Sequence, residues 1–129
     1  MKVDPAGALH KLLSGYMDSM LLETRVGMPC KVVTFNEAAS TADIQPIIKI
    51  SSEAPALIHG VPVLFQRFKV NGGEPVEYKP YLKSGDIVFA VCSDRELKNA
   101  KSGQVTDPDT GRRHSVNDAV IVGVFGWSH

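Results

Sequence analysis

The chain has 129 residues and a mass of 14.0 kDa, which suits one globular domain and is too small for two separate cores. Its 43% hydrophobic and 22% charged residues exclude an intrinsically disordered chain. Fourteen basic and fourteen acidic side chains cancel, so net charge gives no attraction to nucleic acid or another polyanion.

The first predicted element is an amphipathic helix from about Pro5 to Thr24. Asp4 is a favourable N-cap, and proline at the first helical position costs no hydrogen bond. Gly7 and Gly15 each weaken a helix by about 1 kcal/mol, so this helix depends on docking. Its apolar face packs either on its own domain or on a partner. That face consists of residues spaced by three and four, namely Leu9, Leu12, Leu13, Tyr16, Met17, Met20 and Leu21.

The rest of the chain predicts short strands separated by turns. Enrichment in β-branched and aromatic residues marks most of them, and Pro46 predicts a bend or an edge position in the second. The run Asn71-Gly72-Gly73 supplies the positive φ angles of a tight hairpin. We therefore expect a helix at residues 1–26 and an all-β, OB-like small barrel of five to six strands at 27–129. The predicted strands are 30–35, 42–50, 61–70, 76–78, 87–92 and 119–125.

Two further features concern burial and location. Cys30 and Cys92 lie in apolar strand patterns without the spacing of a zinc site, so we expect reduced, buried thiols. Residues 87–92 are almost all apolar, which predicts that the outer face of this strand is also covered.

No apolar run approaches the about 20 residues of a membrane span, and the N-terminus does not have the pattern of a signal peptide. We expect the protein to be made and kept in the cytoplasm.

The long polar segment before the last strand predicts a short helix at 94–102 and a turn at 107–111. Loops of this length are usually functional or contact a partner. The turn lacks the glycine and glutamate positions of an EF-hand, and the four histidines share no metal-ligand spacing. No nucleophile stands beside a base in any known motif, so the chain is not expected to be an enzyme.

Four short stretches carry a resemblance to a known family. They are Val61-Pro62-Val63, Ser84-Gly85-Asp86, Asp94-Arg95-Glu96 and residues 114–119. In this order, over residues 29–125, the chain resembles the N-terminal barrel domain of the phage baseplate central spike family. Members of that family are membrane-puncturing proteins at the tip of contractile tails.

The resemblance implies a virion structural protein in the tail baseplate. It would form a homotrimer on the tail axis beneath the hub, plug the tail tube and touch the host envelope transiently. The barrel core would be Val61, Val63, Phe65, Ile87, Phe89 and Val91. Subunits would meet through Asp94, Arg112, Arg113, His114, Asp118 and Trp127. Outside the resemblance, Leu9, Leu12, Leu13, Tyr16, Met17 and Met20 are candidates for docking on the hub.

Relatives in that family continue into a β-helix needle whose tip can hold a His-bound iron ion. This chain ends soon after the barrel and has no His-x-His motif, which favours a blunt plug or an adaptor for a separate tip protein. If a trimer axis gathered three copies of His129, they could bind iron or another divalent metal. A terminal histidine without a ligand is the alternative, and no other cofactor is expected.

An OB-fold that binds single-stranded nucleic acid is the competing hypothesis. Arg112 and Arg113 lie near Lys98, Lys101 and His114, and such clusters can line an oligonucleotide path. A solvated loop, or an ion pair between subunits through Asp94 or Glu96, explains the cluster equally. Base stacking needs exposed aromatic rings. Most aromatic residues here (Phe35, Phe65, Phe68, Phe89, Phe125) are predicted in the core, with Tyr78, Tyr81 and Trp127 as exceptions.

Overall fold

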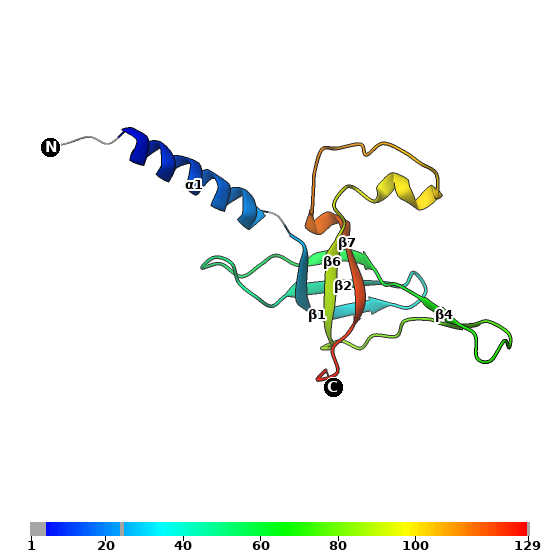
Figure 1. The fold of residues 1–129 in the computed structure, drawn as a ribbon. Helices are drawn as coiled ribbons and strands as arrows, with labels where there is room; N and C mark the ends of the chain where they lie inside the picture. The colour runs from blue at the N-terminus through cyan, green and yellow to red at the C-terminus, as the bar shows by residue number, and fades with distance from the viewer. Residues whose placement is uncertain (1–4, 24, 129) are drawn as a thin grey trace.

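The computed structural model describes residues 5–23 and 25–128, with one α-helix and seven strands among them. The helix α1 spans Pro5–Glu23, as predicted, and Thr24 lies outside the described residues. Figure 1 shows the helix beside a curled sheet, with a long loop above the sheet. The other elements are β1 (Gly27–Asn36), β2 (Thr41–Pro46), β3 (Ile58–Pro62), β4 (Gln66–Phe68), β5 (Val76–Tyr78), β6 (Ile87–Cys92), the 3-10 turns η1 (Lys98–Ser102) and η2 (Val116–Asp118), and β7 (Ala119–Val124).

Five strands form one antiparallel sheet in the order β3-β2-β1-β6-β7. The two edges of the sheet approach each other through a parallel bridge between Val63 and Ile121. At this seam the Leu64 N–H donates to the Ile121 carbonyl at 3.1 Å. A curled sheet whose first and last strands meet leaves little exposed edge. The OB-like fold is therefore confirmed.

Irregular pairing lets the sheet curl. The register shifts between Val32 and Thr34 in β1, and again between Phe89 and Ala90 in β6. Such bulges increase local twist and bend a strand. The second predicted strand ends at Pro46 and does not continue to residue 50, since proline has no N–H to extend the ladder.

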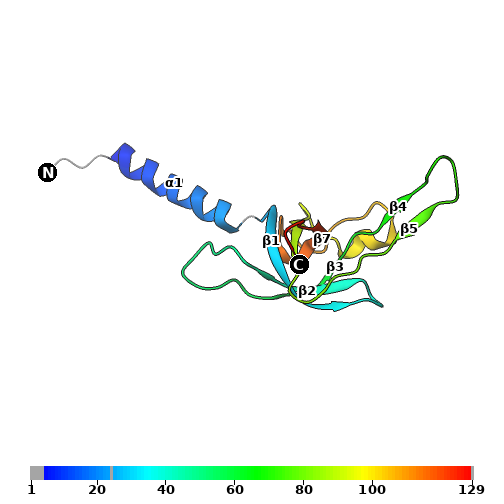
Figure 2. The ribbon, with the colours of Figure 1, turned by 90° about the horizontal axis from the view of Figure 1, so that it is seen from below.

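The predicted third strand, 61–70, is divided in the structure. β3 ends at Pro62, and β4 pairs with β5 as a separate two-stranded hairpin. Its tip uses positive φ angles at Asn71 (48°) and Gly72 (72°), as the sequence predicted. Figure 2 shows this hairpin projecting on the side of the barrel opposite α1.

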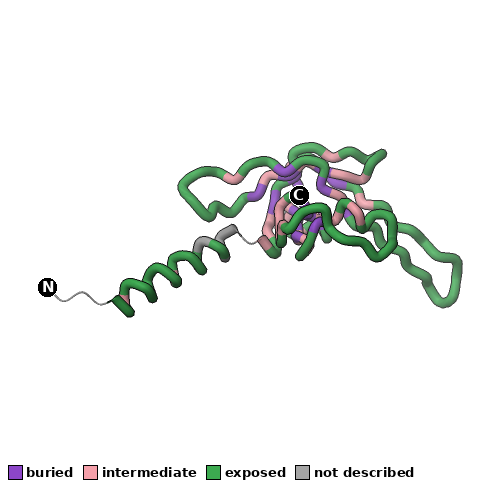
Figure 3. Tube along the Cα trace, turned by 90° about the horizontal axis from the view of Figure 1, so that it is seen from above, coloured by how far each residue is buried: buried purple, intermediate pink, exposed green. Residues whose placement is uncertain are grey.

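The core lies inside the curled sheet (Figure 3). Val61 and Val63 belong to it. Phe65 does not, because it follows the seam and is 43% exposed. The fully or nearly fully buried apolar residues are Cys30, Val32, Ala42, Ile44, Ile58, Val61, Val63, Leu82, Val88, Ala90, Cys92, Ala119 and Ile121.

The predicted face of β6 is also wrong. Ile87, Phe89 and Val91 are half-buried on the outer side, and the alternate residues Val88, Ala90 and Cys92 point into the core. A shift of one residue exchanges the two faces of a strand. Six apolar residues in succession contain no alternation from which the correct face could be chosen.

The two cysteines are free and buried, as predicted. Burial, reinforced by the neighbouring Cys92, raises the pKa of Cys30 to about 11. Burial also raises the pKa of Cys92. Both thiols therefore stay protonated at neutral pH and act as small apolar side chains.

Candidate assembly surfaces

A charged cluster fixes the long loop between β6 and β7. The Arg112 guanidinium donates two hydrogen bonds to Asp118, from Nε to Oδ2 and from Nη2 to Oδ1, each at 2.8 Å. Its Nη1 lies 3.2 Å from Glu96 Oε2. Both carboxylates are buried and the arginine is half-buried. We call these three side chains the arginine clamp.

Backbone and side-chain donors complete the clamp. Glu96 accepts from the Asp109 N–H at 3.0 Å and from the Thr110 hydroxyl at 3.0 Å. Asp118 accepts from the Leu97 N–H at 3.1 Å. Both buried carboxylates thus have charged and neutral donors, as buried charges require. Hydrogen bonding from Arg112 holds the pKa of Asp118 below its usual value.

Two residues predicted at a subunit interface, Arg112 and Asp118, therefore bind each other within one chain. Glu96, for which an ion pair between subunits was one interpretation, likewise pairs with Arg112 of its own chain. The physical reason is that the loop folds back on itself, so the start and the end of the loop meet at the same arginine. These charges are already paired before any partner arrives. A contact between subunits stays a prediction.

The remaining loop candidates lie near the same end of the barrel. The His114 N–H donates to the Asp94 carbonyl at 3.3 Å, and the His114 carbonyl accepts from the Arg25 N–H at 3.0 Å. His114 has a φ of 45°, and its Nδ1 is buried without a hydrogen-bond partner among the described residues. Arg113 and Asp94 are exposed. Among the loop residues predicted at a subunit interface, Arg113 and Asp94 are therefore the ones with exposed side chains.

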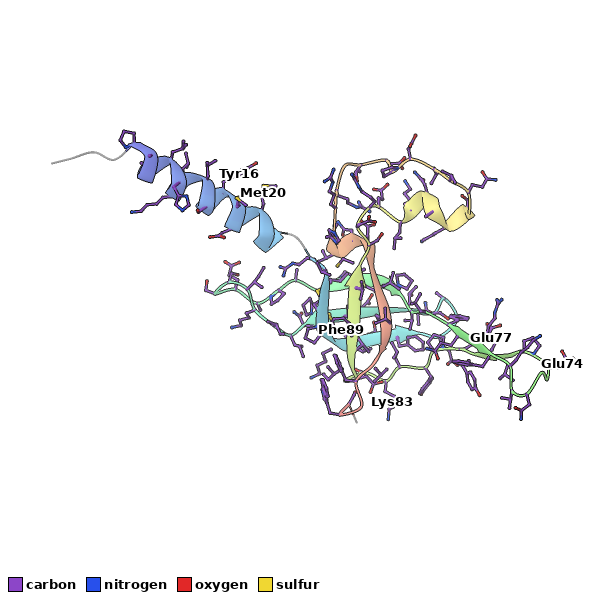
Figure 4. The ribbon with its side chains drawn as sticks, viewed as in Figure 1. Tyr16, Met20, Glu74, Glu77, Lys83 and Phe89 are labelled. Atoms are coloured by element: carbon purple, nitrogen blue, oxygen red, sulfur yellow. The ribbon has the colours of Figure 1, made fainter. Side chains whose placement is uncertain are left out.

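Trp127 belongs to the opposite end of β6. Its ring stacks on Phe125 with centroids 4.1 Å apart, and Phe125 meets Phe89 edge to face at 5.9 Å. Figure 4 labels Phe89 on the sheet. The Ser128 hydroxyl fixes this column, since it accepts from the Ile87 N–H at 2.8 Å and donates to Asp86 at 3.2 Å. Trp127 is 63% exposed, so an anchored aromatic ring faces outward.

A second exposed apolar surface surrounds the foot of the β4–β5 hairpin. Phe68 and Tyr78 meet edge to face at 5.7 Å. Neither Phe65 nor Phe68 is in the core, which corrects the prediction that placed them there. We call this surface the hairpin patch, and its exposed members are Leu64, Phe68, Tyr78, Tyr81, Val122 and Val124.

A third surface is an apolar groove of about 300 Å³ beside the start of β1. The loop between β2 and β3 forms one wall, and Val116 contributes from η2. We call it the β1 groove. Its lining is Arg25, Gly27, Met28, Pro29, Pro46, Ile48, Ile50, Pro55, Ala56, Leu57, Ile58 and Val116.

Predicted metal ligation cannot be placed, because His129 lies outside the described residues. Within residues 5–23 and 25–128, no group of three or more His, Cys, Asp or Glu side chains is arranged to hold a metal ion. The same residues contain no helix long and apolar enough to cross a membrane.

The sequence of the barrel that carries these surfaces matches a known protein family. Residues 28–123 match the family described as the phage protein Gp138 N-terminal domain. The chain belongs to this family. The Gp138 N-terminal domain match starts in β1 and ends in β7, so it covers the curled sheet, the hairpin and the long loop, and α1 precedes it. A search among curated proteins gave no match.

Membership in the Gp138 N-terminal domain family confirms that the resemblance to a phage protein is correct. Sequence reasoning missed the β1 groove and the role of Ser128. Ile48 and Ile50 continue the alternation of the strand predicted at 42–50, so they were assigned to that strand, and the apolar Leu57 in the following loop was the remaining signal for the groove. Nothing in the sequence signals the Ser128 anchor, because its partners are 41 and 42 residues away.

Proposed function

We propose that this protein is a structural component of the phage tail baseplate. It would form a homotrimer on the tail axis below the hub, close the tail tube and contribute to penetration of the host envelope. The observation that carries the proposal is the family match over residues 28–123, which spans the whole barrel. The finer assignment to the central spike rests on the resemblance in the order of elements.

The architecture supports a mechanical role. The sheet closes on itself at Val63 and Ile121, so load along the barrel is shared among backbone hydrogen bonds and few edges are exposed. The arginine clamp holds the long loop to the barrel. No catalysis is assigned to the chain.

The exposed apolar surfaces support association. Soluble monomers rarely expose apolar patches larger than a few hundred Å². Here α1, the hairpin patch and Trp127 all present large apolar side chains to solvent. We propose that neighbouring copies, the baseplate hub, tail tube proteins and a separate tip protein are the partners that cover them. A metal held by three copies of His129 at the axis is part of the same proposal, and metal analysis of the purified assembly tests it.

Two measurements test the proposal. Light scattering on the full chain should give about three times 14.0 kDa, and a stable monomer at high concentration would contradict the axial trimer. Antibody labelling of intact virions should decorate the distal end of the tail tube. Labelling of another part of the particle would contradict the plug.

A second candidate function is binding of single-stranded nucleic acid. The exposed rings of Phe68, Tyr78 and Tyr81 favour it, because bases stack on exposed aromatic side chains. Arg67, next to Phe68, adds a positive charge on the hairpin. Electrophoretic mobility shifts with oligonucleotides at low salt separate the two functions. Salt-sensitive binding at micromolar protein that is lost in Tyr78→Ala would support nucleic-acid binding.

A further inference from the structure

The β1 groove is an apolar surface that no part of the described chain fills. Several of its walls are exposed hydrophobic side chains: Ile48 is 60% exposed, Ile50 46% and Leu57 43%. A dry cavity of about 150 Å³ holds a benzene ring, so about 300 Å³ has room for about two apolar side chains. The single charged residue in its lining is Arg25. The groove therefore fits an apolar segment.

The helix α1 presents the matching surface. Leu9, Leu12, Leu13, Tyr16 and Met17 lie on one side of it and are each 54% to 70% exposed. Figure 4 shows Tyr16 and Met20 coming from the same side of the helix. The opposite side carries Lys11 and Asp18. Most of the stability of a helix in a protein comes from tertiary packing of its apolar face, so this face needs a covering surface.

The helix does not fill the groove of its own chain. The chain leaves the barrel from a fixed point, because the Arg25 N–H donates to the His114 carbonyl and the Val26 carbonyl accepts from the Cys92 N–H at 2.8 Å. From there α1 extends away from the sheet in both views (Figures 1 and 2). Arg25 and Gly27, which follow α1 in the chain, are themselves part of the groove wall.

We propose that, in the assembled protein, α1 of one copy lies in the β1 groove of a second copy. Every copy supplies both surfaces, and the net charge of zero gives no repulsion between copies. Two copies that exchange helices form the contact twice, which adds to the area buried between them. The inference goes beyond the proposed function, because it holds wherever in the particle the protein is found.

Crosslinking between two differently tagged full-length chains tests the contact. One chain carries Met17→Cys on the apolar face of α1, and the other carries Leu57→Cys in the groove. After co-expression, a short thiol-to-thiol crosslinker should join the two tagged chains. The native thiols Cys30 and Cys92 are buried and stay unmodified in the folded protein. Lys11→Cys, on the opposite face of α1, is the matched control and should lose the crosslink.

Three outcomes overturn the inference. Equal crosslinking from Lys11→Cys would show that α1 has no preferred face toward the groove. A crosslink found only when Met17→Cys and Leu57→Cys are in the same chain would place α1 in its own groove. An oligomer without any crosslink would leave the helix for another partner such as the hub. Absence of the protein from tails would refute the proposed function and leave a positive crosslink standing.

Discussion

Replacing Gly27 by alanine should push the Phe89 ring out of place. A Cβ built at Gly27 lies 2.6 Å from Phe89 Cζ and 2.9 Å from Cε1, where ordinary contacts begin at 3.4 Å. The ring cannot retreat freely, because Phe125 meets it at 5.9 Å and Trp127 stacks on Phe125 at 4.1 Å. Overpacking of this kind costs about 1–3 kcal/mol. Alanine recovers about 0.5–1 kcal/mol of strand propensity over glycine, so the free energy of unfolding should fall by about 1 kcal/mol, and by at most about 2.5 kcal/mol.

Urea unfolding, followed by fluorescence of Trp127, the single tryptophan, measures this change. All variants are compared at one protein concentration, because assembly would add to the apparent stability. Gly123→Ala is the matched control. Gly123 pairs with Phe89 across the β6–β7 ladder, but a Cβ there meets nothing within 4 Å. Its substitution should leave stability unchanged or slightly higher.

Phe89→Leu supplies the decisive comparison, because a leucine lacks the ring edge that the new methyl group would strike. In that background Gly27→Ala should cost almost nothing. An equal loss of stability with and without the ring would refute the steric reasoning. The close approach of Phe89 to Gly27 would then not be the cause of the lost stability.

Three further predictions follow from polar contacts and burial. Hydrogen bonding from Arg112 lowers the pKa of Asp118 from its ordinary value of 3.8. The clamp therefore stabilises the folded protein above pH 3.8, and this contribution is lost as the pH falls through the lowered pKa. Asp118→Asn should abolish this acid dependence of the free energy of unfolding, measured by urea unfolding. Ser128→Ala removes two hydrogen bonds and should cost about 1–2 kcal/mol, with a fluorescence shift as Trp127 loses its anchored position. Cys30 should react with a thiol reagent only after unfolding, and rapid reaction of the native protein at pH 8 would contradict its burial.

Local patterns predicted the elements well. The proline start of α1, the hairpin at Asn71 and the apolar strand at 87–92 are all present in the structure. Each depends on residues close together in sequence, where propensity and turn chemistry decide the outcome. The OB-like order of strands followed from their number and from the long excursion before the last one.

Contacts across the fold were not predictable in the same way. On the outer face of β6, Phe89 approaches Gly27, which is 62 positions earlier in the sequence, and no sequence pattern links the two. Phe65 continues an apolar run, yet the core ends at the Val63–Ile121 seam just before it. The arginine clamp joins residues 96, 112 and 118 through a loop reversal that charge spacing alone does not reveal.

The arginine clamp has a consequence for how the long loop recognises other molecules. A mobile loop of more than twenty residues would lose conformational entropy on binding, at about 1–2 kcal/mol for each backbone position fixed. In this protein, contacts from Glu96 and Asp118 fix much of that segment during folding. The loop is thus preorganised, and it should bind a rigid, complementary surface tightly while adapting poorly to surfaces of different shape.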